Sequence, residues 1–249
     1  MNESIAISLA KLERTEKHID TLRDEVMGYL ADEPSEIITE PDGTIKLKFI
    51  TDCPPIIPIL AGEIIYHIRS VLDHLAFALV SANITGMRLP EGWERRCQFP
   101  IHATLPKGYA VPPVPIKRFH EYLPGISIKA YTFLEGLQPY YTRGNGNQTL
   151  GWVAKLSDID KHRHVNLVEG QTRQRMIQIL LPLDPSAQVT NPLYRRMKMQ
   201  GGFHPFVAFD ESALGSGPNK IPIADVMQSC HDLVKTRIIP AFDEFLQNL

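Results

Sequence analysis

Apolar residues recur at helical spacing along four stretches of the chain. The clearest stretch is 58–82, where residues spaced at about 100° per position gather on one face. That face consists of Ile64, Ile68, Val71, Leu72, Leu75 and Leu79. Similar stripes predict helices over 3–30, 148–162 and 222–247. Pro240 lies inside the last of these, so we expect the helix to kink or split there.

Alternation of apolar and polar residues predicts the strands. The run EIITEPDGTIKLKFI alternates on both sides of Pro41-Asp42-Gly43, which predicts a β-hairpin over 36–50. Between 165 and 210, HVNLVEG and RMIQILLPL are expected to form consecutive strands with a turn at Glu169-Gly170. These patterns together predict the α+β class: a mainly helical bundle with a β-hairpin and a small antiparallel sheet inserted between helices, in a single domain over 1–249.

Composition limits the classes of function. The chain has 249 residues, of which 43% are hydrophobic and 22% charged, as is ordinary for a soluble globular protein. Its net charge of −2 gives no overall attraction to nucleic acid, so such binding would need a local patch. Three widely spaced cysteines and the lack of an apolar leader favour a cytoplasmic protein. No apolar run approaches the roughly 20 residues that span a membrane, and no phosphate-binding loop, dinucleotide fingerprint, kinase set or GxSxG motif occurs.

Two polar clusters stand out against these patterns. The first lies on the clearest predicted helix and comprises His67, Arg69, Asp73 and His74. Arg69 and Asp73 are four residues apart and can pair along the helix, whereas His74 lies roughly 140° from Arg69 around the axis. The second cluster is Asp160–His164, DKHRH, at a predicted helix end where an aspartate is unfavourable. Arg69 is a candidate partner for Asp160, and we expect Arg69 or His74 to lie within a few ångströms of residues 160–164, which would bring both clusters into one site.

The segment Arg69-Ser70-Val71-Leu72-Asp73-His74 resembles the Arg-x4-6-His signature of the HEPN superfamily (higher eukaryotes and prokaryotes nucleotide-binding). Over roughly 61–168 the chain also resembles a set of uncharacterised bacterial proteins with an RSALDHL-type helix and a later DKHR-type segment. HEPN domains are helical bundles that typically dimerise. Their ribonuclease members cleave RNA without metal in a cleft lined by arginine and histidine from both chains. The resemblance implies a homodimer in which Arg69 binds phosphate and His74 is the general acid or base.

The residue types suit that chemistry. RNA cleavage needs one group that takes the proton of a 2′-hydroxyl and one that protonates the leaving oxygen, and histidine titrates near neutral pH. A fixed guanidinium stabilises charge on phosphate, and Asp73 is placed to hold Arg69 in position. The expected substrate-binding residues are Asp160, Lys161, His162 and Arg163. Their cations would add the local positive field that the net charge lacks, so RNA is the expected partner and no cofactor is expected.

Two alternatives remain open. The histidines can instead form a site for zinc, iron or manganese, as in DinB-like bundles, which bind metal through histidines of separate helices. Its ligands would be His67, His74, His162 and His164, with Asp73 and Asp160 as further oxygen ligands. No HExxH or similar short motif accompanies them. In the other alternative, the polar residues only fix the packing of a non-catalytic bundle that binds a partner.

Overall fold

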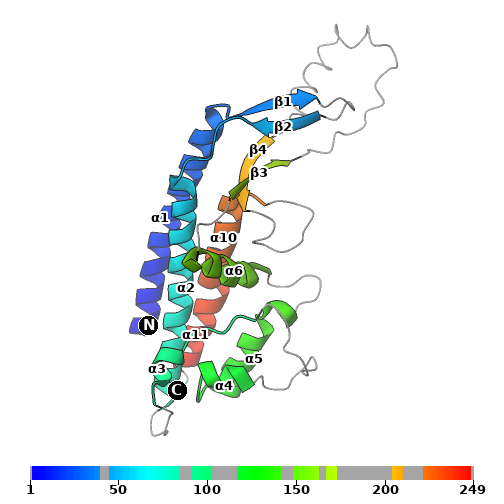
Figure 1. Cartoon of the computed structure of the whole chain (residues 1–249). Coiled ribbons are helices and arrows are strands. Elements are labelled where there is room, and N and C mark those ends of the chain that lie inside the picture. Colours follow the sequence, from blue (N-terminus) through cyan, green and yellow to red (C-terminus); the bar gives the residue numbers. More distant parts are fainter. Residues whose placement is uncertain are drawn as a thin grey trace, which may run out of the picture.

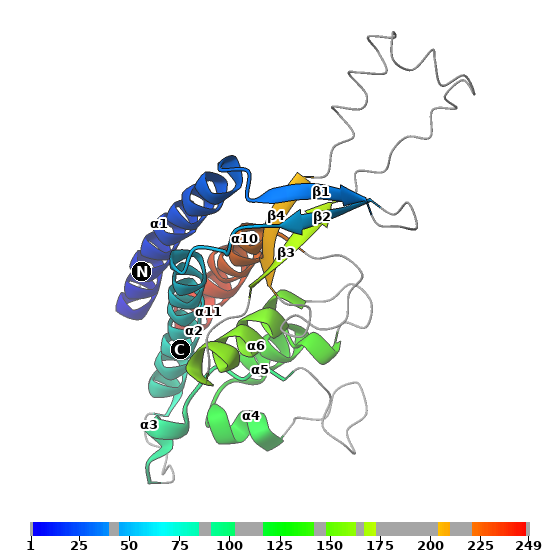
Figure 2. The same ribbon diagram turned by 45° about the horizontal axis from the view of Figure 1, so that its top comes forward.

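The structure, a computed structural model, is mainly helical. It describes residues 2–39, 45–84, 91–102, 117–141, 148–162, 167–172, 204–209 and 221–247. The long helices are α1 (Glu3–Ala31), α2 (Ile56–Asn83), α6 (Gln148–His162) and the C-terminal pair α10 (Ile223–Leu233) and α11 (Ile239–Gln247). Helices α1, α2 and α10–α11 lie side by side as a shaft, and α6 packs across α2 (Figures 1 and 2). The helix bounds agree with the predicted ranges to within two residues.

Helix α1 presents a strip of small and apolar residues to α2. Asn2 caps its start, because Asn2 Oδ1 accepts the Ser4 N–H at 2.9 Å. The buried positions recur every three or four residues: Ile5, Ser8, Leu12, Thr15, Ile19 and Leu22. The hydroxyls of Ser8 and Thr15 donate to carbonyls four residues earlier, so both side chains are buried without losing a hydrogen bond. The strip therefore lets α1 and α2 pack as an antiparallel pair (Figure 1).

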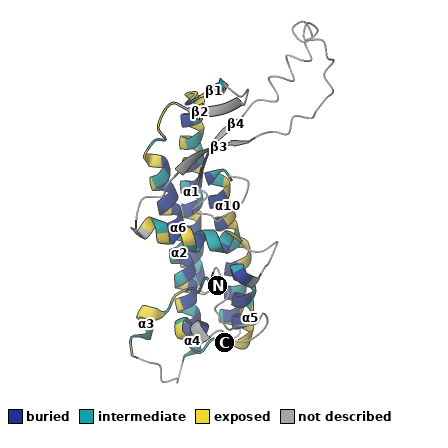
Figure 3. Ribbon diagram, turned by 45° about the vertical axis from the view of Figure 1, so that its right-hand side comes forward, coloured by how far each residue is buried: buried dark blue, intermediate teal, exposed yellow. Residues whose placement is uncertain are grey.

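Helix α2 is the core of the shaft, with α1, α6, α10 and α11 packed around it. Its predicted apolar face is buried along its whole length, as the dark ribbon of α2 in Figure 3 shows. Pro58 lies in the first turn, where no backbone N–H is needed, and is tolerated there. Among the described residues, α2 is the one helix long and apolar enough to cross a membrane. Half of its most apolar 18-residue window is buried inside the bundle.

The C-terminal run contains a π turn. This turn spans Val234–Ile238 between α10 and α11, and the Ile239 N–H donates to Val234 O, five residues earlier. Pro240 follows directly. A proline has no N–H, and its ring clashes with the carbonyl four residues before it, so a wider turn at this point relieves the clash. The irregularity expected at Pro240 is thus taken up by the preceding turn, and the helix continues to Gln247.

Between α2 and α6 the described chain forms short helices. They are α3 (Trp93–Arg96), α4 (Lys117–Tyr122), α5 (Ile128–Gly136) and the 3-10 turn η1 (Pro139–Tyr141). Phe119 and Leu123 at the end of α4 and Leu134 of α5 are fully buried. These helices therefore extend the core beside the lower part of the shaft (Figure 1).

The strands form two separate antiparallel pairs. β1 (Ser35–Thr39) and β2 (Ile45–Phe49) form the predicted hairpin, with Ser35 opposite Phe49. β3 (Leu167–Thr172) pairs with β4 (His204–Phe209), which lies much later in the chain. Both pairs lie at the end of the shaft where α1 ends and where α2 and α10 begin (Figures 1 and 2).

Of the expectations for 165–210, one is not shown and one is wrong. The small antiparallel sheet is not seen, since the part of the chain that the structure describes holds only two-stranded pairs with no ladder between them. The turn expected at Glu169-Gly170 is wrong, because both residues lie inside β3, opposite Val207 and Phe206. The partner of β3 among the described residues is β4, which packs on α1 and α10. The run RMIQILLPL lies outside the described residues.

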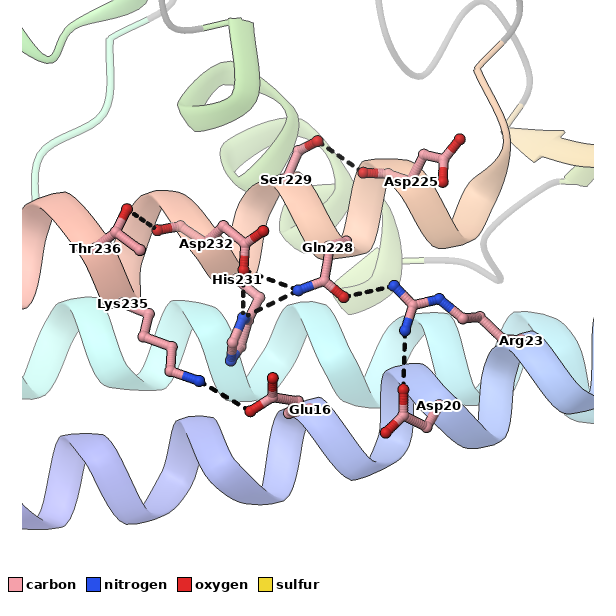
Figure 4. A network of polar contacts seen from close by, with 10 residues as sticks. All are labelled: Glu16, Asp20, Arg23, Asp225, Gln228, Ser229, His231, Asp232, Lys235 and Thr236. Atoms are coloured by element: carbon pink, nitrogen blue, oxygen red, sulfur yellow. Dashed lines mark hydrogen bonds and ion pairs between the residues drawn. The ribbon is translucent and has the colours of Figure 1, made fainter.

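A polar network ties α1 to the C-terminal run (Figure 4). Arg23 Nη2 donates to Gln228 Oε1 at 2.6 Å, and Lys235 Nζ donates to Glu16 Oε2 at 2.9 Å. Between these contacts His231 is fully buried, with Nδ1 3.0 Å from the exposed Asp232 carboxylate. Its Nε2 has no hydrogen-bond partner among the described residues. These contacts fix the position of α10 along α1, and they leave the other edge of the α1–α2 pair for the site described next.

Candidate functional site

The Arg69–Asp73 pair predicted on α2 is formed, and it holds a distant backbone segment. Arg69 Nε donates to Asp73 Oδ2 at 3.1 Å, and Arg69 Nη2 lies 2.9 Å from Asp73 Oδ1 in the same ion pair. Arg69 Nη2 also donates to Phe99 O at 3.0 Å, and the Phe99 N–H donates to Asp73 Oδ1 at 2.9 Å. The Arg69 side chain is only 14% exposed. The pair therefore satisfies both backbone groups of Phe99 in a largely buried position.

The segment around Phe99 is held from a second side as well. Gln138 Nε2 donates to Pro100 O at 3.0 Å, and Gln138 Oε1 accepts the His102 N–H at 2.8 Å. The Phe99 ring is fully buried, with its centroid 6.1 Å from that of Phe242 in α11. Arg69 thus contributes to anchoring residues 99–102 in the core, a role that the sequence did not suggest.

His74 lies on another side of α2 and faces α1. The Lys11 ammonium donates to Ser70 Oγ at 2.9 Å and lies 3.2 Å from His74 Nδ1 and 3.4 Å from Nε2. Partial burial lowers the pKa of His74 below its ordinary 6.5, and the charge of Lys11 lowers it further, while Asp73 acts in the opposite direction. His74 remains exposed to solvent on its open side. The lowered pKa favours the neutral imidazole, and a cation lies beside it.

The same face of α2 carries His67 two turns earlier. Its ring centroid lies 5.7 Å from that of His18 in α1, and His18 Nδ1 lies 3.3 Å from Glu63 Oε2. Partial burial lowers the pKa of His67, and His18 and Arg14 lower it further. We name this row of side chains the α1–α2 seam. It consists of Lys11, Arg14 and His18 of α1 and Glu63, His67, Ser70 and His74 of α2.

Three members of the seam, Lys11, Arg14 and His18, were missed by the sequence reasoning. They are spaced i, i+3 and i+7, so they share one face of α1 next to the strip that packs on α2. That spacing is visible in the sequence. Its meaning is not, because charged residues beside an apolar stripe are the normal solvated edge of an amphipathic helix.

A cavity of about 770 Å³ opens at the end of the seam nearest the strands. Its walls include Pro55, Pro58, Ile59 and Tyr66 at the start of α2 and Arg14 and His18 across from them. Asp160 of α6 also lines it. Asp160 packs directly on Gly62, where a Cβ atom would lie only 2.4 Å from Asp160 Oδ1. The glycine therefore makes room for the carboxylate at the cavity wall.

Asp160, the first residue of the second polar cluster, contacts α2 at Gly62 and not at Arg69. Gly62 precedes Arg69 by seven residues, about 10 Å along the helix. The hydrogen bonds of Arg69 go to Asp73 and Phe99, so the expected Asp160–Arg69 contact is not formed among the described residues. Helix α6 approaches Arg69 through Ser157 and Asp158, which share with it a separate cavity of about 320 Å³.

The rest of the DKHRH cluster gives less information. Lys161 and His162 belong to α6, but their side chains lie outside the described part of the structure, as do the whole residues Arg163 and His164. No group of three or more histidine, cysteine, aspartate or glutamate side chains comes together among the described residues in a way that could hold a metal. His67 lies near His18 and not near His74. The alternative ligands His162 and His164 stay a prediction.

The thiol nearest this region is not an activated nucleophile. Burial raises the pKa of Cys97 to about 11, and the neighbouring Asp73 carboxylate acts in the same direction. Comparison with known proteins gives no family assignment: no family model matches the chain, and neither does any curated protein or solved structure. Function is therefore inferred from the side chains described above.

Proposed function

We propose that the protein binds RNA along the α1–α2 seam and cleaves it without a metal ion. The observation that carries the proposal is the contact of Lys11 Nζ with Ser70 Oγ and the His74 ring, at 2.9 to 3.4 Å. It places a fixed positive charge beside a solvent-exposed imidazole whose lowered pKa favours the neutral form. Such a pair can bind a phosphate and accept a proton next to it.

The proposed reaction uses these two groups in one step. Neutral His74 takes the proton of a ribose 2′-hydroxyl, and that oxygen attacks the adjacent phosphorus. The bond to the 5′-oxygen of the next nucleotide breaks, and this oxygen takes up a proton. Lys11 neutralises charge on the phosphate and is the nearest proton donor for the leaving oxygen, since burial lowers the pKa of its ammonium group. The products are a 2′,3′-cyclic phosphate and a free 5′-hydroxyl.

This assignment differs from the roles that the HEPN resemblance implies. There Arg69 is the phosphate-binding cation, but its guanidinium donates to Asp73 and Phe99. We therefore assign the phosphate to Lys11 and Arg14 of the seam and a positioning role to Arg69 and Asp73. Asp160, Lys161, His162 and Arg163 remain proposed substrate-binding residues at the end of α6.

A homodimer is a separate part of the proposal. Outside the cavity described above, Ile7 of α1 and Phe77 of α2 are 46% and 43% exposed, and a second copy of the chain could cover them. Light scattering that gives twice the chain mass of 28.1 kDa would support a dimer, and a mass equal to one chain at micromolar concentration would contradict it.

The experiment is RNA cleavage in EDTA. A fluorescently labelled single-stranded RNA is incubated with the wild type and with the variants His74→Ala and Lys11→Met. Lys129→Met on α5 is the matched control, because Lys129 is exposed and distant in the fold from the seam. We expect cleavage to fall at least roughly 100-fold in His74→Ala, as for the loss of a general base, and RNA affinity to fall in Lys11→Met.

The outcomes separate the alternatives. Wild-type binding without cleavage overturns the catalytic part and leaves an RNA-binding protein. Cleavage that persists in both seam variants overturns the assignment of the site. Neither binding nor cleavage overturns the proposal and favours the non-catalytic bundle. Stoichiometric metal in the purified protein that is lost in His74→Ala would favour the metal alternative.

A further inference from the structure

The cavity at the end of the α1–α2 seam adds exposed apolar surface to the charged residues that it shares with the seam. Tyr66 and Ile59 are 64% and 53% exposed on its wall, and Pro55 and Pro58 add two rigid apolar rings. A groove that binds only charged groups and water does not require this much exposed apolar surface. Flat apolar groups of this kind, with an aromatic ring among them, are what unpaired nucleobases stack on.

Charges of both signs line the cavity. Glu63 and Asp160 both line it, and Gly62 leaves room for the Asp160 carboxylate at the wall. The two carboxylates accept hydrogen bonds from the N–H groups of a base. Arg14 lines the cavity from the side of α1, and Lys11 lies about one turn further along α1, beside His74. A strand can therefore place a base in the cavity and its phosphates on the seam.

We infer that this cavity binds an unpaired nucleobase that carries an amino group, so that the protein selects single-stranded over double-stranded RNA. The inference rests on the proposed function, because it assumes that the seam takes the phosphates of the same strand. The volume of about 770 Å³ falls in the range of natural small-ligand pockets and admits a purine with room for its ribose. Guanine, adenine and cytosine offer an amino group to Glu63 and Asp160, whereas uracil offers none.

The test compares two probes on the same variants. The affinities of the full-length protein for a labelled single-stranded oligoribonucleotide and for a blunt RNA duplex are measured by fluorescence anisotropy, with EDTA present and cleavage blocked by a 2′-O-methyl backbone. Tyr66→Ala should weaken single-strand binding roughly five- to 150-fold, the effect of losing one base–aromatic stack, and leave duplex binding unchanged. Tyr66→Phe keeps the ring and should stay within about twofold of the wild type. Glu63→Gln should reduce the preference for oligomers rich in guanine, adenine or cytosine over oligouridine.

Nucleosides make the result independent of the seam. Guanosine, adenosine, cytidine and uridine have no phosphate, so their binding, followed by ligand-observed NMR with and without Tyr66→Ala, reports the cavity alone. Binding of amino-bearing nucleosides that Tyr66→Ala abolishes supports the base site even if the RNA-cleavage proposal fails. Equal loss of single-strand and duplex binding in Tyr66→Ala, or no nucleoside binding at all, overturns it. A changed mass in light scattering with unchanged RNA affinity would assign Tyr66 to a contact between copies and would also overturn it.

Discussion

Replacing Arg69 by methionine separates its two interpretations, as a residue that anchors Phe99 or as a residue that binds substrate. The substitution keeps a long apolar side chain but removes the hydrogen bonds to Asp73 and to Phe99 O, together with the ion pair with Asp73. Asp73 keeps only its bond from the Phe99 N–H, and the carbonyl of the buried Phe99 loses its donor. We therefore expect the main effect to be on stability.

The size of the effect follows from burial. Breaking a fully buried ion pair costs about 3–5 kcal/mol, whereas exposed pairs contribute about 0–1 kcal/mol. The Arg69 side chain is 14% exposed and that of Asp73 is 35% exposed, so water can replace part of what Asp73 loses. An unsatisfied buried carbonyl costs about 1–3 kcal/mol. We expect Arg69→Met to lower the free energy of unfolding by about 2–3 kcal/mol, which at this chain length corresponds to a fall in Tm of about 4–12 °C.

The assay is urea unfolding followed by circular dichroism, together with thermal melting. Arg95→Met is the matched control, because Arg95 lies exposed on the short helix α3. Asp73→Asn and the double variant complete a mutant cycle, in which we expect a coupling of about 0.5–3 kcal/mol between Arg69 and Asp73. RNA cleavage is measured on the same samples at a temperature where all of them are folded.

One result would refute the reasoning. If Arg69→Met is as stable as Arg95→Met, within about 0.5 kcal/mol, the contacts with Phe99 contribute little to the fold. If that variant has also lost cleavage, Arg69 acts on the substrate, as the HEPN resemblance implies, and the assignment of the phosphate to Lys11 is wrong.

Three further predictions concern the seam and its surroundings. The pKa of His74 is lowered in the fold, so the cleavage rate should fall with acid only below pH 6.5. In Lys11→Met the pH of this fall should rise, because the charge that lowers the pKa of His74 is gone. A fall at the same pH in both proteins would contradict the role of Lys11. Gly62→Ala should change the unfolding free energy by less than about 1 kcal/mol, because the gain in helix propensity offsets the displacement of the flexible Asp160 carboxylate. A larger loss of unfolding free energy, measured by urea unfolding, would show that Asp160 is rigidly held. Pro240→Ala should raise the unfolding free energy by about 1 kcal/mol, since residue 240 gains an N–H inside a helix. A loss of stability in the same urea unfolding would show that the π turn requires the proline.

Much of the helical scaffold follows from the sequence, because helical periodicity is a local property. The apolar stripe of α2 fixes which of its faces enters the core, and it also fixes that Arg69 and His74 point to different sides. The i, i+4 pairing of Arg69 with Asp73 is local in the same sense, and it is present. The hairpin of β1 and β2 needs only a short turn between alternating runs, and it too is present.

The partners of those faces were decided by the tertiary structure alone. The sequence cannot tell that the free side of Arg69 meets the backbone of Phe99, or that Asp160 meets Gly62, about two helix turns from Arg69. Nor does it show that Lys11 lies against His74, or that β3 pairs with the distant strand β4. The physical reason is the same in each case. Periodicity sets the direction of a side chain relative to its own element, whereas its partner depends on how elements distant in the chain pack to bury the most apolar surface.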